Sequence, residues 1–437
     1  MLAIKELYQN KSMLILSFAI SVSYSFILLN CGKEGGIYSS LFYVFFLIGI
    51  FIWNWKEIEV SENIDKFGVL SFFLIIALHI GLLIGYKIAN PATAPLWVVD
   101  SYTMHIPGAE NIANFLAGKD ELRSMTSMWD KIYITQIVVG LFFYLFGVSP
   151  IVSSGVLLCA KLCTNFFVFS IAKQMFDKKV AAYAVLIYAL MPTVLFYTLV
   201  YYKEAFVQLL TVIIAWSFYK LNEKKRPLYF CILVISLLIL ANERFYLFPM
   251  YMITILLVIL TSYSTKVTVK GVVMVIIAML AFVFYQKYSP AIAMHGGGIS
   301  SLLGHFKTAY TNFDDIDPIN RQLPYVLCIG KIMFSPYVTL NKFNIFTEYS
   351  NLLTWGAIPN QITILLFLLG SLSQLRNHFK QSWYMLMPIL LFILLFAYVA
   401  PFSGRQRDSF YPIISIYAGY GLTVLAKYLK SRGYLKN

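Results

Sequence analysis

The sequence predicts an all-α polytopic membrane protein that crosses the bilayer about twelve times, with both termini in the cytoplasm. Hydrophobic residues make up 59% of the 437-residue chain and charged residues only 12%, whereas soluble domains carry roughly 25% charged residues. The mean hydropathy is +0.74. The apolar residues are grouped into runs near spanning length, and the segments between the runs carry Lys and Arg. Lipid is therefore the expected solvent for most of the chain.

The crossings are predicted from the lengths of the apolar runs. A spanning helix needs about 20 predominantly apolar residues. The first run follows Lys5 and Lys11, and no small-residue cleavage site comes after it, so we expect it to be retained as an anchor. The predicted crossings lie at residues 13–29, 39–54, 68–88, 150–172, 180–198, 204–219, 227–241, 245–262, 268–286, 353–375, 383–400 and 409–426.

One further apolar stretch, Ile132–Val148, is predicted not to cross. Asp130 and Lys131 precede it and Gly147 ends it. If it stays on the outer side, the later basic clusters fall in the cytoplasm, whereas a crossing here would place all of them outside. We therefore expect a re-entrant or interfacial juxtamembrane helix in the first large outer loop. The clusters are Lys173, Lys178 and Lys179; Lys224, Lys225 and Arg226; Lys266 and Lys270; Arg376 and Lys380; and Lys427, Lys430, Arg432 and Lys436.

This topology divides the chain into two sets of flanking helices, a core and a second loop. In the first outer loop, Pro107 suits the first position of a short helix and Gly118 suits its C-terminal cap. The parts are the N-terminal membrane helices at 1–88, the membrane core at 89–286 with its outer loop at 89–149, the second outer loop at 287–352, and the C-terminal helices with a basic tail at 353–437.

Charged residues at the predicted outer face are the candidate functional groups, because charges at membrane depth are costly and usually functional. Asp100 follows a predicted crossing, where a carboxylate suits a general base. Glu204 lies in the tight turn of a helical hairpin. Arg244 lies in another turn, at headgroup level, where a guanidinium can bind a lipid phosphate. Arg405 and Arg407 break the positive-inside pattern, which favours an anionic ligand beside them.

Each of these candidates also has a purely structural interpretation. Asp100 could cap a helix, and Glu204 could pair with Lys203 or favour the start of a helix. Arg244 could extend along apolar surface to reach the interface. Asp408 could neutralise one of the two late arginines.

Other classes of protein fit the sequence less well. The net charge of +14 collects in short loops and at helix ends, so it predicts topology and not nucleic-acid binding. No pair among the five cysteines has CxxC spacing, and no His and Asp spacing matches a metal motif. We predict no metal site and no cofactor, with a divalent metal left open. Charges and Gly or Pro breaks inside paired helices are scarce, so we expect no transport path through the midplane.

Four stretches form a pattern: WVVDSYTMHIPGAENIANFLAGK at 97–119, YITQIVVGLFFYLFGVSP at 133–150, FDKKVAAYAVLIYALMPTVLFYTLVYYKEAF at 176–206 and SGRQRDSFYPIISIYAGYGL at 403–422. In this order and spacing they resemble glycosyltransferases of the C superfamily (GT-C), polytopic enzymes that use polyprenyl-phosphate sugars. The branches they most resemble are the protein O-mannosyltransferases and the aminoarabinose transferases. The resemblance covers roughly residues 97–262 and 383–426.

The resemblance implies an inverting transfer, in which an acceptor hydroxyl attacks the anomeric carbon of a sugar and a lipid phosphate leaves. Asp100 matches the family's catalytic carboxylate, and Glu204 matches the hairpin acid that positions a substrate. Arg244 stands where the family often has Lys or Arg for the lipid phosphate. Arg405 or Arg407 would stabilise the leaving phosphate, where negative charge develops.

Substrate contacts are also expected from three residues beside these acids, Tyr102, His105 and Tyr202. Ser101 stands where the family has a second acid, and about three predicted crossings precede Asp100 where those branches have one. A related bacterial surface-polysaccharide enzyme therefore fits better than a protein mannosyltransferase.

These residues together predict a membrane glycosyltransferase. It would move a hexose or pentose from a polyprenyl-phosphate donor to a lipid-linked or cell-surface glycan, on the outer face of a bacterial inner membrane. Membrane lipids are expected partners and nucleic acid is not. One alternative is an O-antigen-type polymerase or ligase acting on lipid diphosphates, which would need outer arginines but not Asp100. Another is a polysaccharide flippase or transporter, which would need polar residues along a central path.

Overall fold

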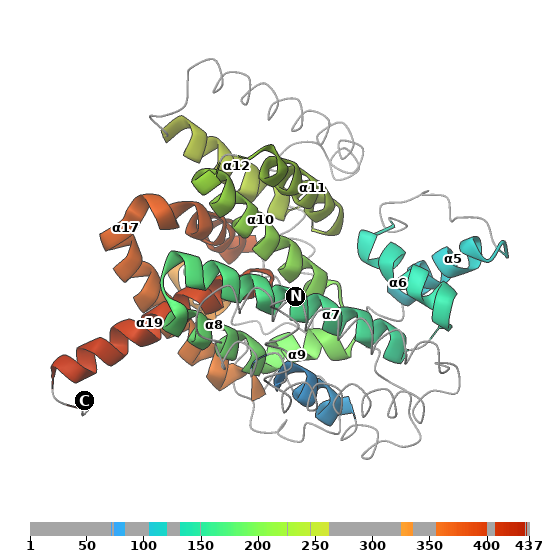
Figure 1. Ribbon diagram of the computed structural model, residues 1–437, viewed down its shortest axis with the longest axis horizontal. Coiled ribbons are helices and arrows are strands. Elements are labelled where there is room, and N and C mark those ends of the chain that lie inside the picture. Colours follow the sequence, from blue (N-terminus) through green and yellow to red (C-terminus); the bar gives the residue numbers. More distant parts are fainter. Residues whose placement is uncertain are drawn as a thin grey trace, which may run out of the picture.

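The computed structural model describes a helical molecule (Figure 1). It describes residues 71, 74–83, 105–119, 132–148, 150–224, 226–244, 246–261, 325–334, 355–399, 407–432 and 434. Every regular element among these residues is a helix, which confirms the all-α prediction for the described part of the chain. Outside it lie the predicted crossings at 13–29, 39–54 and 268–286, most of the second outer loop, and the site residues Asp100, Tyr102 and Arg405.

The described helices include long apolar ones, as is typical of a membrane-embedded protein. Among the described residues, four helical segments are long and apolar enough to cross a membrane, and a bent pair of helices makes a fifth. Shorter apolar helices among the described residues include α11 (Pro227–Glu243) and α12 (Leu247–Thr261). The four segments are α7 (Pro150–Met175), α10 (Glu204–Lys224), the first part of α17 (Ala357–Val399), and the short helix η4 (Asp408–Phe410) with α19 (Tyr411–Ser431).

The bent pair is α8 (Lys178–Leu190) with α9 (Pro192–Leu199), where the apolar run at 180–198 predicted one helix. The two helices meet at a bend of 54°. Between them Met191 is extended, with φ −70° and ψ 114°. Pro192 causes the bend because it has no N–H to continue the helix and its ring disfavours the helical conformation of the preceding residue.

The long helix α17 doubles back on itself (Figure 1). A Cβ added at Gly370, in its first half, would collide with the backbone of Tyr417 in α19. In its second half, the ring of Phe392 lies 5.4 Å from that of Phe410, centroid to centroid. A straight helix would hold Gly370 and Phe392 about 33 Å apart, whereas Phe410 and Tyr417 are only about 10 Å apart along the chain. The two crossings predicted on either side of Arg376 therefore form one sharply curved helix.

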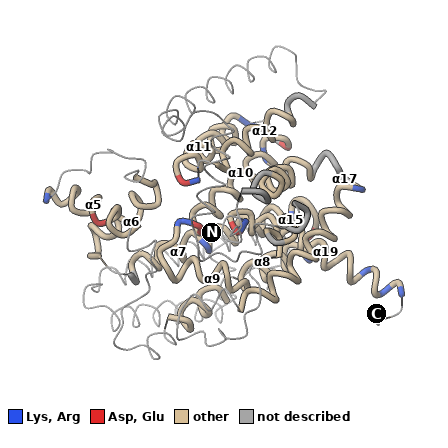
Figure 2. The backbone as a smooth tube through the Cα atoms, turned by 180° about the vertical axis from the view of Figure 1, so that it is seen from behind, with Lys and Arg blue, Asp and Glu red and all other residues tan. Residues whose placement is uncertain are grey.

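Close packing around α19 depends on its glycines. A Cβ at Gly421 would collide with the backbone of Leu366 in α17, and a Cβ at Gly419 would lie 2.8 Å from the backbone nitrogen of Ala184 in α8. Only a residue without a Cβ permits such an approach between helix backbones. Beyond these contacts the C-terminal end of α19 leaves the bundle and carries exposed basic residues (Figure 2).

A separate pair of helices, α5 (Ile106–Leu116) and α6 (Ile134–Phe146), lies beside the main bundle (Figures 1 and 2). As predicted, Pro107 is at the start of α5, and Gly118 follows its end with a φ of 68°. Gly140 lets α6 approach the backbone of α5 closely. α6 has 13 residues, about 20 Å of helix, which is shorter than the roughly 30 Å hydrocarbon core of a bilayer. The separate helix predicted between residues 132 and 148 is thus present.

Candidate functional site

Two turns from different helical hairpins meet at an ion pair. Glu204 is the first residue of α10 and is fully buried, and Arg244 directly follows α11. The Arg244 guanidinium forms a salt bridge with the Glu204 carboxylate. The dipole of α10 also favours a negative charge at this position. Two site residues that the sequence placed in separate turns are therefore in direct contact.

Lys203 connects the same turn to α6. Its ammonium nitrogen lies over the ring of Tyr133, 3.7 Å from the ring centroid. Tyr133 is the N-terminal cap residue of α6. A cation over an aromatic face is attracted by the ring quadrupole, and the contact contributes about 1–2 kcal/mol when it is shielded from water. The start of α10 and the start of α6 are therefore held together.

His105 adds an imidazole to this region. It lies just before α5 and is buried, with its ring centroid 6.0 Å from that of Tyr133 and 5.5 Å from that of Tyr201. The Tyr201 hydroxyl donates to the carbonyl oxygen of Thr135, 3.3 Å away. Burial, and then the negative charge of Glu243, raise the pKa of Tyr201 well above its usual range, so the hydroxyl keeps its proton. We name the following residues the acid–base cluster: His105, Tyr133, Lys203, Glu204 and Arg244.

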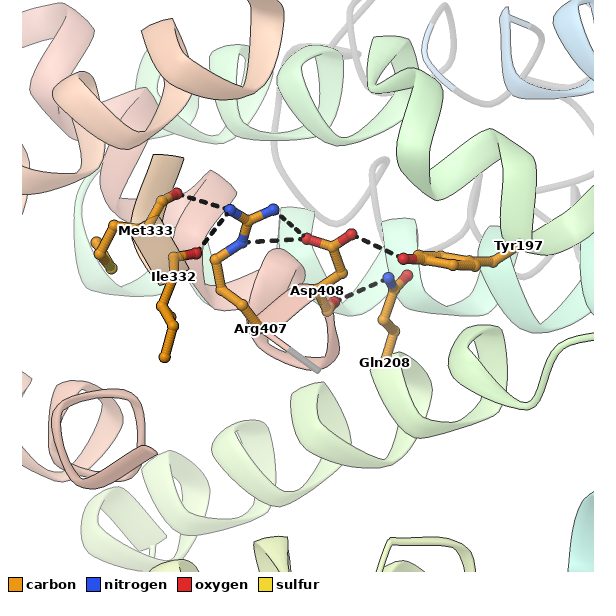
Figure 3. Close-up of polar contacts among 6 residues, drawn as sticks. All are labelled: Tyr197, Gln208, Ile332, Met333, Arg407 and Asp408. Atoms are coloured by element: carbon orange, nitrogen blue, oxygen red, sulfur yellow. Dashed lines mark hydrogen bonds and ion pairs between the residues drawn. The ribbon is translucent and has the colours of Figure 1, made fainter. Parts of the chain in front are cut away.

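The third predicted turn holds a buried ion pair of its own (Figure 3). Arg407 is fully buried, and its Nη2 and Nε donate to Oδ1 of Asp408 at 2.6 and 3.2 Å. Its Nη1 donates to the carbonyl oxygens of Ile332 and Met333 in α15 (Tyr325–Phe334), at 3.2 and 2.6 Å. The structural alternative, in which Asp408 neutralises an arginine, is thus confirmed for Arg407.

Tyr197 lies between this ion pair and the acid–base cluster. Its hydroxyl donates to Oδ2 of Asp408 at 2.9 Å, and its ring centroid lies 6.1 Å from that of Tyr202. Tyr202 is half-buried and directly precedes Lys203. From α10, Gln208 Nε2 donates to the backbone carbonyl of Asp408 at 2.9 Å (Figure 3). All three predicted turns therefore lie at the same end of the described bundle.

The predicted site residues accordingly have four different outcomes. The cluster contains three of them, and a fourth lies on its border. A fifth is buried in the neighbouring ion pair, and the remaining three lie outside the described residues. In that order they are Glu204, Arg244 and His105; Tyr202; Arg407; and Asp100, Tyr102 and Arg405.

Lys161 is a buried polar residue that was not among the predicted site residues. It is fully buried near the middle of α7, and its ammonium nitrogen has no hydrogen-bond partner among the described residues. The nitrogen lies 5.8 Å from the ring centroid of Tyr188. His79 is buried in the same bundle and hydrogen-bonds the hydroxyls of Ser154 and Thr198, at 3.0 and 3.1 Å. The sequence signal for this buried lysine is a single Lys inside a long apolar run, because ionisable residues at membrane depth are usually functional.

The acid–base cluster brings a carboxylate, a guanidinium, an ammonium and an imidazole into one buried region. Such groups can bind an anion and can orient a hydroxyl. Within the described part of the chain, no group of three or more His, Cys, Asp or Glu could hold a metal ion. No protein-family model and no curated protein sequence matches this chain. The functional proposal therefore depends on the chemistry of these residues.

Proposed function

We propose that this protein is a GT-C-type glycosyltransferase with about twelve crossings and its active site on the outer face of a bacterial inner membrane. It moves a sugar from a polyprenyl-phosphate donor to a lipid-linked or cell-surface glycan. The observation that carries this proposal is the Glu204–Arg244 ion pair, because it joins two turns that are distant in sequence. Charges gathered at one end of an apolar bundle suit a lipid whose phosphate lies at headgroup level.

In the proposed reaction, an acceptor hydroxyl attacks the anomeric carbon while the bond from that carbon to the lipid phosphate breaks. Asp100 takes the hydroxyl proton as general base, and the electron pair of the broken bond leaves with the phosphate. Arg244 binds the phosphate where negative charge develops. Asp100 is five residues from His105, so the two residues are at most about 18 Å apart even along an extended chain.

Glu204 and Arg405 take supporting roles in this proposal. Glu204 orients the Arg244 guanidinium before the donor arrives, since a buried arginine without a counter-charge is costly. In the third turn we assign the phosphate contact to Arg405, because Arg407 already donates to Asp408 and to two carbonyl oxygens.

Transfer by an Asp100→Asn variant tests the proposed base. Asn keeps the size of the side chain but cannot take the proton, so sugar transfer in membranes given a radiolabelled polyprenyl-phosphate sugar should fall at least about 100-fold. Asp120→Asn makes the same chemical change in the same loop and should leave transfer unchanged. Full transfer by Asp100→Asn would remove this residue from the mechanism.

The donor class is tested by the lipid that remains bound to the purified protein. Mass spectrometry should find a polyprenyl phosphate or its sugar conjugate, and an Arg244→Gln variant should retain less of it. An Arg226→Gln variant, in the turn at the other end of α11, is the matched control. A lipid diphosphate in place of the monophosphate would favour the polymerase or ligase alternative.

Two observations favour a second candidate function, a polysaccharide flippase or transporter. Lys161 is buried near the middle of α7, and the α8–α9 pair bends at Met191, and both features are found along transport paths. In proteoliposomes, Lys161→Met would then abolish translocation of a lipid-linked sugar and Asp100→Asn would not. The glycosyltransferase proposal predicts the reverse for sugar transfer.

A further inference from the structure

The first turn of α6 is held by the last turn of α11. The first N–H groups of a helix have no partner within the helix. In α6, the N–H of Ile134 donates to Oδ1 of Asn242 at 3.1 Å, and the N–H of Thr135 donates to Oε1 of Glu243 at 2.7 Å. Asn242 also donates from Nδ2 to the carbonyl oxygen of Ile132, at 3.3 Å. Two side chains of α11 thus cap a helix more than a hundred residues away in sequence.

The residue that follows these two caps is Arg244. Asn242 and Glu243 face α6, and Arg244 pairs with Glu204 at the start of α10. At Arg244 the backbone leaves the helical conformation, with φ −142° and ψ 78°. Three consecutive residues therefore contact both α6 and Glu204. A shift of this short segment changes the contacts with α6 and with Glu204 together.

The α5–α6 pair also contacts the bundle through α7 and through the turn before α10. Its two helices pack tightly on each other, since a Cβ at Gly140 would lie 2.7 Å from the carbonyl oxygen of Ala109. Val139 and Phe143 of α6 pack against apolar residues of α7. The hydrogen bonds from Asn242 and Glu243 add to the contacts that Lys203 and Tyr201 make at the start of α6.

We propose that Asn242 and Glu243 are positioning residues that couple the docking of α6 to the Glu204–Arg244 ion pair. With α6 docked, Arg244 is directed toward Glu204. When a donor phosphate draws Arg244 away from Glu204, the hold on α6 weakens and the helix pair moves to admit the acceptor. The identity of the phosphate rests on the proposed function, whereas the coupling between α6 and the ion pair does not.

Amide hydrogen exchange of the purified full chain tests the coupling. A Glu204→Gln variant removes the charge that holds Arg244, so the amides of Ile134 and Thr135 should exchange about fivefold faster. Glu223→Gln changes the same helix at its far end, where Glu223 pairs with Lys220 at 2.9 Å, and should leave exchange in α6 unchanged. Exchange in α6 that is the same in Glu204→Gln and in the wild type would overturn the proposal.

Two further variants separate positioning from loss of structure. Glu243→Gln keeps an oxygen acceptor for the Thr135 N–H and should exchange at nearly the wild-type rate, whereas Glu243→Ala should exchange about five- to tenfold faster there. Equal rates in Glu243→Ala and the wild type would contradict the capping role. If Glu204→Gln does not fold, Arg244→Lys keeps the charge but loses the planar fork, and it should still accelerate exchange in α6.

Adding undecaprenyl phosphate tests whether the coupling responds to the lipid part of the proposed donor. The lipid should accelerate exchange of the Ile134 and Thr135 amides in the wild type but add little in Glu204→Gln, where the coupling is already lost. Bound lipid without any change in α6 would overturn the coupling and leave the proposed function standing. Absence of lipid binding, with faster exchange in Glu204→Gln, would instead remove the proposed donor and support the coupling.

Discussion

Arg407 directs its guanidinium toward groups of the protein itself. The sequence favoured both arginines of its turn as ligands of an anion, because the turn breaks the positive-inside pattern. Asp408, one residue later, accepts two hydrogen bonds from Arg407, and two carbonyl oxygens of α15 accept two more. The sequence shows the neighbouring acid. It does not show the contact with α15, because that helix lies more than seventy residues earlier in the chain. At the residue scale, the neighbouring Asp408 was predictable as a partner of this turn, whereas the carbonyl oxygens of α15 were not.

The main effect of replacing Arg407 should therefore be a loss of stability and not a loss of ligand binding. Arg407→Met leaves the buried Asp408 carboxylate without its counter-charge, which costs about 3–5 kcal/mol. The thermal unfolding midpoint in detergent should fall markedly. Arg376→Met, at an exposed position of α17, should change it little. A stable Arg407→Met variant with weakened lipid binding would mean that Arg407 binds the lipid, as the sequence predicted.

Lys161 should show the opposite effect on stability. Its ammonium group is buried without a hydrogen-bond partner among the described residues, so Lys161→Met removes a polar group from an apolar site while keeping its length. We expect the free energy of unfolding to rise by about 1–3 kcal/mol, measured by chemical or thermal denaturation. Lys427→Met, at an exposed position near the end of α19, serves as the comparison and should stay within about 0.5 kcal/mol of the wild type. Lower stability of Lys161→Met would mean that the amine has a partner in the folded protein.

At the scale of elements, local residue chemistry predicted helix ends better than helix shapes. Pro107 and Gly118 mark the ends of α5 because the constraints on their backbone are local. The bend before Pro192 has an equally local cause. It was missed because the helix was predicted only from the length of its apolar run. The curvature of α17 was not predictable, since it depends on how both of its halves pack against α19.

The glycines of α19 give a prediction at this scale. Gly421→Ala adds a Cβ where the Leu366 backbone already lies, so the helices must separate, at a cost of about 1–3 kcal/mol. The thermal midpoint should fall accordingly. Gly330→Ala, in α15, meets no described atom within 4 Å and should be neutral or slightly stabilising. Similar midpoints for the two variants would mean that α17 and α19 are not in close contact.

For the whole molecule, the charge pattern gave a correct grouping of the turns. It placed the turns at Glu204, Arg244 and Arg407 on one side, and contacts now connect them at one end of the described bundle. It could not predict that Asn242 and Glu243 cap α6, because this depends on the distance between helices far apart in sequence. The number of crossings and their direction stay predictions.

Cysteine labelling tests that direction. In a background with the five native cysteines replaced, Lys119→Cys and Lys178→Cys introduce thiols at exposed positions after α5 and at the start of α8. An impermeant maleimide added to intact cells should label position 119 and not position 178, because the predicted topology places them on opposite sides. Labelling at both positions would mean that α6 crosses or that another predicted crossing is wrong.

The glycine contacts of α19 also determine which parts of the protein can move. Gly419 and Gly421 are two residues apart and bring the backbones of two different neighbours, α8 and α17, against the same helix. α19 cannot slide or rotate past one neighbour without colliding with the other. These three helices should therefore travel as a rigid body through any working cycle. Motion is then left to the parts around this body, and the α5–α6 pair is the part whose hold on the bundle we propose to change.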